Sequence, residues 1–304
     1  MEMYLTLRTV HIVAAVVTLA GFILRGIWML RASPNLQHPV AKIAPHLLDT
    51  LLLLAGLGSW ALLNLPVDAF SVATNPVAKP RMSAMALCTL IQQRTGRAAI
   101  LHCTTRDHNR LSLQGLLWGA RALGLETVLI TTGDFVALGD RAATTTVRDV
   151  DLFGLIAMAR EAGLYTGVVF DPFLETGSLE RAVDHLKAKA QAGAQFVVTQ
   201  PAYDEAGADL LHQATQGCGL PVVMGILPLR TPRHADFLHE KVSGIVVPAA
   251  VRETMHQATD NVQEGNANAR HALTLAREWF SGACIMPPFD HYEILFDILA
   301  ADPR

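Results

Sequence analysis

Charged side chains are scarce in this 304-residue sequence, and their scarcity limits what the protein can be. They make up 17% of the chain, against roughly 25% in an average soluble protein, while hydrophobic residues make up 51%. This composition excludes a disordered or collagen-like chain. The formal net charge of −3 provides no broad basic field, so we expect no nucleic-acid partner.

Several ligand-binding and catalytic motifs are also missing. Because the four cysteines form no CxxC pair, we expect neither a zinc site nor a disulfide framework, and reduced thiols are the simplest interpretation. None of the 12 histidines belongs to an HExxH motif, so we expect no metal site. No GxGxxG motif follows the first predicted strand, which weakens a dinucleotide-binding Rossmann interpretation.

The shortage of charge is greatest at the N-terminus. Residues 1–66 hold only six charged side chains and contain two uncharged runs, residues 9–24 and 50–67, separated by a polar turn with three prolines. A membrane-spanning helix needs about 20 mostly apolar residues, so both runs are transmembrane candidates of marginal length. The alternative is a pair of buried helices in a soluble protein. We therefore predict two domains, a membrane hairpin at 1–66 in contact with the lipid bilayer and a second domain at 67–304.

Two segments of this hairpin, residues 21–30 and 45–53, resemble the start of the SirB family of small integral membrane proteins. That family continues with further membrane helices, whereas the pattern here ends near Leu63. The resemblance therefore implies a partial SirB-like segment and a membrane-associated protein. The flanking cations divide evenly between the two ends of the hairpin, so they leave its orientation open.

Strand-like and helix-like segments alternate after residue 67. Short apolar runs predict strands, and amphipathic segments with a period near 3.6 predict helices. The strands are expected at 68–73, 98–103, 127–132, 166–170, 195–200, 221–227, 243–247 and 283–286. The main helices are expected at 113–123, 151–162, 179–192, 266–280 and 291–299. This alternation predicts βαβ units and a parallel sheet.

The number of units favours an α/β fold of the TIM (β/α)8 type, with a doubly wound sheet as the alternative. A TIM barrel typically needs about 250 residues, and the domain from residue 67 is short of that by roughly one βα unit. We therefore predict a barrel that lacks its first βα unit. The resulting seam would expose backbone groups of the edge strands. A second copy of the chain in a homo-oligomer, or an irregular N-terminal segment, would have to cover it.

Polar side chains gather where the predicted strands end, the edge at which barrel active sites are built. They include His102, Thr132, Asp134, Asp171 and Gln200. Carboxylates, an amide and an imidazole around one mouth could bind a polar heterocycle, although their spacing alone does not identify it. In the loop at 105–110, two adjacent charges, an arginine and an aspartate, could form a structural ion pair.

Seven motifs of this domain occur in the same order in one enzyme family. They are NPVAKPRMS at 75–83, TRDHNR at 105–110, TGD at 132–134, AGAQF at 192–196, TQP at 199–201, GILP at 225–228 and IMPPF at 285–289. Through them, residues 67–300 resemble methylenetetrahydrofolate reductase. The resemblance implies a flavoprotein oxidoreductase of one-carbon metabolism and methionine biosynthesis. Such an enzyme passes hydride from NAD(P)H through bound FAD to 5,10-methylenetetrahydrofolate, which becomes 5-methyltetrahydrofolate. We expect this domain in the cytoplasm.

The resemblance also implies roles for individual residues. Asp134 matches the catalytic aspartate near the flavin and the folate pterin, and Gln200 matches the folate-binding glutamine. A carboxylate can accept hydrogen bonds from the pterin amino group and favour an iminium cation, while an amide offers both a donor and an acceptor. The positions matching flavin contacts are His102, Thr132, Gly133, Asp134 and Lys189.

Each of these residues also has a purely structural interpretation. Asp134 could cap the following turn, as aspartate often does, and His102 could be an ordinary strand-end histidine. Lys189 could be a solvent-exposed helix charge, and Gln200 could bond to the neighbouring backbone.

The chain departs from the family pattern in two places. The absent first strand normally carries the glutamate that serves as general acid, and no residue here matches it. General acid catalysis contributes typically about 10²- to 10⁴-fold, so we expect folate reduction to be severely impaired. In addition, Asp290 and His291 replace an arginine common after the MPPF sequence, which puts that substrate contact in doubt. A non-catalytic flavin- or folate-binding relic, or a chimeric membrane protein, therefore stays open as an alternative.

Overall fold

The computed structural model describes residues 65–134, 144–173, 178–242, 244–288 and 291–300, together with Val13 and Val16, which are helical. The rest of the predicted membrane hairpin lies outside the described residues. Among the residues that are described, the structure contains no helix of sufficient length and hydrophobicity to cross a membrane. Residues Val67–Pro288 form one compact unit.

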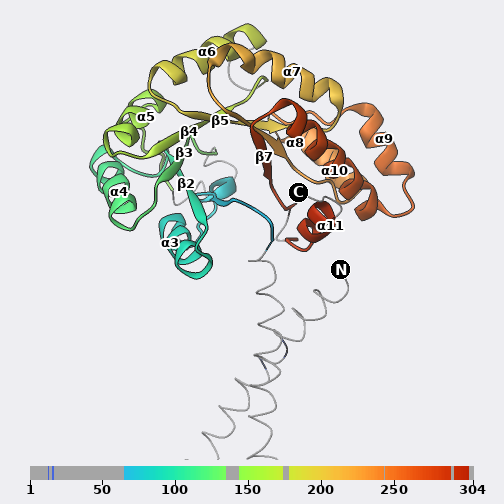
Figure 1. Ribbon diagram of the computed structural model, residues 1–304, viewed down its shortest axis with the longest axis horizontal. Coiled ribbons are helices and arrows are strands. Elements are labelled where there is room, and N and C mark those ends of the chain that lie inside the picture. The colour runs from blue at the N-terminus through green and yellow to red at the C-terminus, as the bar shows by residue number, and fades with distance from the viewer. Residues whose placement is uncertain are drawn as a thin grey trace, which may run out of the picture. The chain divides into compact units, whose positions relative to one another are not determined.

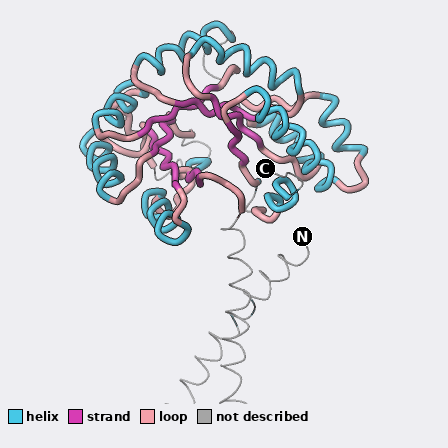
Figure 2. Tube along the Cα trace, viewed as in Figure 1, coloured by secondary structure: helices cyan, strands magenta, loops and turns pink. Residues whose placement is uncertain are grey.

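In the described residues of this unit, seven parallel strands form one sheet at its centre, with the strands side by side in chain order. They are β1 (Ala69–Val72), β2 (Ala98–Thr104), β3 (Thr127–Thr131), β4 (Tyr165–Phe170), β5 (Phe196–Pro201), β6 (Val222–Ile226) and β7 (Gly282–Ile285). The sheet curls into an arc, and the helices cover its convex side (Figures 1 and 2). The fold is therefore an α/β half-barrel of TIM-like type. Its two edge strands are β1 and β7.

Helices connect successive strands, as the alternating sequence pattern predicts. They are α3 (Ala84–Thr95), α4 (Arg110–Ala122), α5 (Leu152–Glu161), α6 (Leu179–Gln191) and α7 (Glu205–Thr215), followed between β6 and β7 by α8 (Pro232–Lys241), α9 (Ala249–Gln257) and α10 (Asn261–Trp279). Short 3₁₀ turns lie at Pro76–Ala78 and Gln216–Cys218. Outside the compact unit, α11 (Ile294–Ala300) begins three residues later than the helix predicted at 291–299.

The local sequence explains where these elements begin and how they are buried. Asn109 and Asp151, for example, cap α4 and α5 with side-chain oxygens that accept backbone N–H groups of the first turn. The central strands are buried on both faces, as expected for parallel strands with helices on one side and a barrel interior on the other. In β3, Val128, Leu129 and Ile130 are each no more than 3% exposed.

One predicted strand is wrong. The described part of the run at 243–247 forms no strand: Gly244 has a φ of +83°, and the Ile245 amide donates to the Val242 carbonyl in a turn. The apolar residues of this run serve a different purpose. Val247 is fully buried in a cluster of side chains that includes Leu238 of α8 and Met255 of α9. Packing between two helices, rather than strand pairing, accounts for the hydrophobicity of this segment.

Candidate active site at the carboxyl ends of the strands

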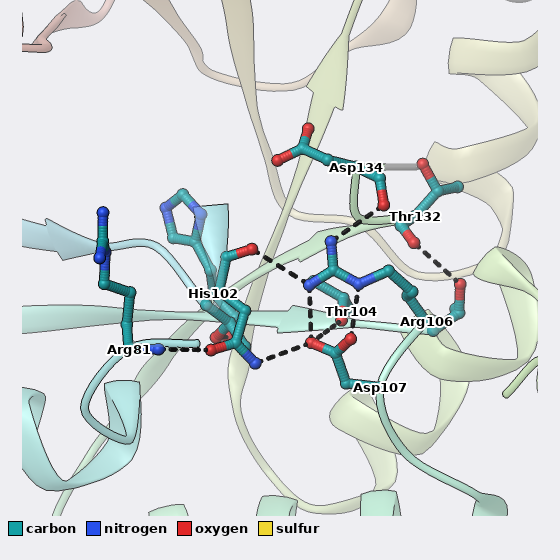
Figure 3. Close-up of polar contacts among 10 residues, drawn as sticks. Arg81, His102, Thr104, Arg106, Asp107, Thr132 and Asp134 are labelled. Carbon is teal, nitrogen blue, oxygen red and sulfur yellow. Dashed lines mark hydrogen bonds and ion pairs between the residues drawn. The ribbon is translucent and has the colours of Figure 1, made fainter. Parts of the chain in front are cut away.

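A buried arginine holds together the loops that follow the first three strands (Figure 3). Arg106, which is 3% exposed, forms a two-pronged ion pair with Asp107, at 2.5 Å from Nε to Oδ1 and 2.8 Å from Nη2 to Oδ2. The same guanidinium donates to the carbonyl of Asp134 at 2.9 Å and to the carbonyl of Asn75 at 3.2 Å. The structural ion pair considered for the 105–110 loop is therefore present, and it also ties the loop after β3 to the loop after β1.

Asp107 is ionised in this network. Burial alone would raise its pKa, but hydrogen bonds from Arg106 and Asn75, together with the charge of Arg106, outweigh burial and lower the pKa below its ordinary value. The Asn75 amide nitrogen lies 3.2 Å from Asp107 Oδ2, and the Thr104 hydroxyl donates to the same oxygen at 3.5 Å. Asp107 is thus a structural carboxylate, since every one of these contacts favours its charged form.

Residues 132–134 leave the end of β3 in a turn that depends on glycine. Gly133 has a φ of +78°, and a Cβ atom there would lie 3.1 Å from Cβ of Arg106 and 3.2 Å from Cβ of Thr104. The carbonyl of Thr132 lies within 3.4 Å of the Thr105 hydroxyl. Both Thr132 and Asp134 are exposed, and the carboxylate of Asp134 points away from the Arg106–Asp107 pair (Figure 3). The turn therefore presents a carboxylate and a hydroxyl at the mouth.

His102 lies inside β2, two residues before the strand ends, because β2 continues to Thr104 rather than stopping at residue 103 as predicted. Its Nε2 atom is 2.7 Å from the hydroxyl of Ser71 in β1. Burial lowers the pKa of His102 to about 4, so the ring is neutral at physiological pH. A neutral imidazole carries one donor and one acceptor nitrogen, which suits hydrogen bonding to a heterocycle.

A second polar group lies at the ends of β4 and β5. Gln200, within β5, donates from its amide nitrogen to Asp171, which directly follows β4, at 3.3 Å. Asp171 also accepts the backbone N–H of Phe173 at 2.9 Å. Gly244 approaches this carboxylate so closely that a Cβ atom there would collide with it. The structural alternative considered for Gln200 was a bond to the neighbouring backbone, whereas the partner observed for its amide nitrogen is the Asp171 side chain.

Lys189 lies in the last turn of α6, and its ammonium donates to the Val169 carbonyl of β4 at 2.8 Å. Lys189 is half-buried, which differs from the solvent-exposed helix charge that was considered as its structural interpretation. His102 lies in β2 and Thr132, Gly133 and Asp134 directly follow the neighbouring β3, while Gln200 lies in β5 and Lys189 reaches β4 from the helix layer.

Sequence reasoning missed three residues that shape this mouth. Asn75 supplies an amide and a carbonyl to the Arg106–Asp107 pair, Ser71 bonds to His102, and Gly244 accommodates Asp171. The positive φ of 43° at Asn75 is a weak local signal, since asparagine tolerates the left-handed region. Within the described residues, no cluster of three or more His, Cys, Asp or Glu is arranged to hold a metal ion.

A half-barrel of parallel strands with polar groups at its carboxyl edge defines a TIM-like α/β protein. Residues 64–278 match the family model described as methylenetetrahydrofolate reductase. The chain therefore belongs to the methylenetetrahydrofolate reductase family. The matched range includes every predicted site residue but ends before the IMPPF motif at 285–289.

The N-terminal segment matches a second family model. Residues 4–73 match the model described as invasion gene expression up-regulator, SirB. This range extends about ten residues past Leu63, where the pattern was expected to end, and it overlaps the start of the reductase match. The match indicates a membrane-associated segment at the N-terminus.

Similarities to solved structures are weak. 2,3-Dimethylmalate lyase, a member of the PEP mutase/isocitrate lyase superfamily, matches at 16% identity over 81% of this chain and 75% of that chain, with a TM-score of 0.47. The tryptophan synthase complex from Pyrococcus furiosus matches at 17% identity over 64% of this chain and 72% of that chain, with a TM-score of 0.34. Matches at these TM-scores carry no information about activity.

Proposed function

We propose that the protein is a membrane-associated reductase that uses FAD and NAD(P)H to convert 5,10-methylenetetrahydrofolate into 5-methyltetrahydrofolate. In this proposal, residues 1–66 are a membrane hairpin, and residues 67–304 are a cytoplasmic barrel that lacks its first βα unit. Membership of the reductase family supports the reaction class. The observation that carries the proposal is the Thr132–Asp134 turn, which the buried Arg106 holds at the carboxyl end of β3.

The groups in β2 and directly after β3 suit the polar edge of a flavin ring. His102 is neutral, and with its Nε2 atom bonded to Ser71 it would meet a ligand through Nδ1, while the exposed Thr132 hydroxyl can donate and accept. Gly133 adds backbone polar groups without a side chain. FAD, when bound at these residues, supplies the capacity to take hydride from a nicotinamide and pass it to folate. Lys189 would form an ion pair with the flavin phosphates. To do so, its ammonium group would have to break its hydrogen bond to the Val169 carbonyl or bond to the carbonyl and a phosphate together.

The folate would be held by Asp134 and Gln200. The Asp134 backbone is fixed by Arg106 while its carboxylate points away from that cation (Figure 3), so the negative charge can act on a ligand in the mouth. A carboxylate in that position accepts hydrogen bonds from the pterin amino group and favours the cationic iminium form of the substrate. Gln200, oriented by Asp171, supplies an amide to the pterin edge.

Proton donation is the weak step of this site. Asp107 has a pKa lowered by its contacts with Arg106 and Asn75 and therefore holds no proton at neutral pH. No residue matches the family's general-acid glutamate, so we propose a folate half-reaction slowed by about 10²- to 10⁴-fold. The nicotinamide half-reaction does not use that acid and is expected to proceed.

Spectroscopy of the full chain purified in detergent tests the proposal. We expect a yellow protein whose flavin absorbance is bleached by NADH or NADPH and slowly restored by methylenetetrahydrofolate. Asp134→Asn should lower folate turnover far more than flavin content. The matched control is Asp184→Asn on α6, which removes an exposed carboxylate (76% exposed) and should change neither. Equal loss of flavin and turnover in Asp134→Asn would contradict the role proposed for Asp134.

The same experiment separates the alternatives. Because the general acid is missing, the chain could be a relic that binds flavin or folate without turnover. Such a protein would bleach with reduced nicotinamide but would never be reoxidised by the folate. A chimeric membrane protein with an inactive barrel would remain colourless even after FAD is added.

A further inference from the structure

The ladder between β5 and β6 is irregular beside Gln200. Val198 of β5 pairs with Val223 of β6, whereas the next recorded pair joins Pro201 to Gly225, so three steps along β5 match two steps along β6. The extra residue makes a β-bulge just before the end of β5, in the segment that contains Gln200. Bulges bend a strand and redirect its side chains, and they are common next to active sites.

Close contacts fix the backbone of this bulge. The Thr199 hydroxyl accepts the backbone N–H of Gly225 at 3.1 Å and donates to the carbonyl of Gln200 at 2.8 Å. Gly225 approaches so closely that a Cβ atom there would lie 2.5 Å from the Thr199 carbonyl oxygen. Thr199 itself is only 2% exposed. The side chain of Gln200 therefore leaves β5 from a backbone that is held in place.

Asp171 then fixes the end of the Gln200 side chain. The strands β4 and β5 are neighbours, and Phe170 pairs with Thr199, so Asp171 and Gln200 lie at the same level of the sheet (Figure 1). Oδ2 of Asp171 accepts from Gln200 Nε2 at 3.3 Å, while Oδ1 accepts the backbone N–H of Phe173 at 2.9 Å. Gly244, between α8 and α9, packs against Oδ2 where a Cβ atom would collide. The carboxylate is thus held on both of its oxygens.

The carboxylate decides which end of the glutamine amide faces the ligand. A carboxylate only accepts hydrogen bonds, whereas the amide has a donor nitrogen and an acceptor oxygen. Gln200 must therefore turn its nitrogen toward Asp171, which leaves its Oε1 for another partner. Within the part of the chain that the structure describes, Oε1 accepts no hydrogen bond. Gln200 therefore offers a ligand an acceptor, as does the exposed carboxylate of Asp134.

We propose that Asp171 is a positioning residue that makes Gln200 an acceptor, and that the pair thereby selects 2-amino-4-oxopteridines over 2,4-diaminopteridines. The 2-amino-4-oxo ring has an N–H group at N3 beside its 2-amino group, so it can donate to Gln200 and to Asp134 together. In the neutral 2,4-diamino ring, N3 carries a lone pair and no hydrogen, so it cannot donate to Oε1. This inference rests on the proposed function, because it requires a folate in the mouth.

A purely structural bridge between β4 and β5 is the other explanation of the pair. The backbone ladder already joins these strands. A bridge of this kind would stabilise the fold without any effect on which ligand is preferred. The two explanations therefore differ in what happens to ligand preference when the pair is altered.

Binding of tetrahydrofolate and of its 4-amino analogue, tetrahydroaminopterin, tests the proposal. Titration calorimetry of the full chain in detergent, with FAD added, gives both dissociation constants without relying on turnover. The pH is kept mildly alkaline so that both rings are uncharged. We expect tetrahydrofolate to bind about tenfold more tightly, because the analogue leaves the Gln200 oxygen without a hydrogen bond.

Asp171→Asn tests the positioning role. The new amide can turn either its oxygen or its nitrogen toward Gln200, so Gln200 can then present either end to a ligand. We expect the 4-amino analogue to bind severalfold more tightly than it binds the wild type, while tetrahydrofolate binds no better. Damage to the fold would weaken both ligands and could not produce this gain.

A second aspartate–glutamine pair supplies the matched control. On the exposed face of α7, Asp209 accepts from Gln213 at 2.7 Å, so Asp209→Asn makes the same change in a similar pair and should leave both constants unchanged. If circular dichroism shows that Asp171→Asn is not folded, Gly244→Ala replaces it. Its methyl group would displace Oδ2 of Asp171 and should also reduce the preference for tetrahydrofolate.

The possible failures are distinguishable. Equal affinity of the wild type for the two ligands, or an unchanged preference in the folded variant, would overturn the role of Asp171 and leave the proposed function standing. If neither ligand binds to the wild type, the proposed function fails, and the selection by Gln200 and Asp171 fails with it.

Discussion

Replacing Arg106 with methionine tests most directly how the loops after β1, β2 and β3 are held together. The change keeps side-chain length but removes four hydrogen bonds, two to Asp107 and one each to the carbonyls of Asp134 and Asn75. It leaves the Asp107 carboxylate, only 17% exposed, without its cation. Breaking a buried ion pair by removing one partner costs about 3–5 kcal/mol. Because Asp107 keeps its bond from Asn75, we expect a loss near the lower limit, about 3 kcal/mol.

Urea unfolding of the detergent-solubilised chain, followed by circular dichroism, measures this loss. Arg110→Met, which removes an exposed arginine, is the control and should change the free energy of unfolding by no more than about 0.5 kcal/mol. In Arg106→Met, burial without a cation raises the pKa of Asp107, so its ionised form destabilises the fold above that pKa. Lowering the pH from 7 toward 5 should therefore reduce the difference in the free energy of unfolding between this variant and the wild type.

The double variant Arg106→Met/Asp107→Leu isolates the cost of the unpaired carboxylate. Removing both charges avoids that cost, so the double variant should be more stable than Arg106→Met alone by about 1–2 kcal/mol. Either of two results would refute this explanation: Arg106→Met lowers the free energy of unfolding by less than about 1 kcal/mol, or adding Asp107→Leu recovers none of the lost stability.

Three further substitutions test other parts of the site. Gly133→Ala places a methyl group 3.1 Å from Cβ of Arg106 at a φ of +78°, so we expect a loss of about 1–2 kcal/mol in the same unfolding assay and weaker flavin retention. His102 has a pKa of about 4 in the fold, below its unfolded value of about 6.5, so it costs stability as the pH falls through this window. The wild type should lose stability between pH 7 and pH 5, and in His102→Gln this loss should be smaller by about 2 kcal/mol. An equal loss in the two proteins would show that His102 does not have a lowered pKa in the fold. Lys189→Met, which breaks the bond to the Val169 carbonyl, should lower FAD affinity about tenfold in a fluorescence titration, and unchanged affinity would leave the lysine a purely structural role.

Strands were predictable where local composition and burial agree. The strand expected at 127–132 is observed at Thr127–Thr131, because its apolar residues are buried on both faces and glycines at 124 and 133 with positive φ bound the segment. The run at 243–247 has a similar composition but packs between α8 and α9. Only the tertiary surroundings distinguish these two uses of the same residue types.

The site was predictable to the extent that it follows from topology. Carboxyl ends of parallel strands share one edge, so His102 and Asp134 were expected to be neighbours. The contacts of Arg106 were not predictable, because they join residues 28 and 31 positions apart that share no local pattern. The sequence indicated a pair with the adjacent Asp107, but nothing in it marks the carbonyl of Asp134 as a partner.

The in-order sheet has a consequence for how the chain folds. Each strand pairs with the strand made just before it, and the most distant partners, such as Val223 and Gly282 of β6 and β7, are only about 60 positions apart. A closed barrel must also join its last strand to its first, which requires closing a loop as long as the whole domain. Among the described strands β1 and β7 do not pair, so the sheet can grow one βα unit at a time as the ribosome delivers them, and the pairing of β1 with β2 does not wait for the C-terminus. We expect partly synthesised chains to acquire protease resistance in successive steps rather than in one final event.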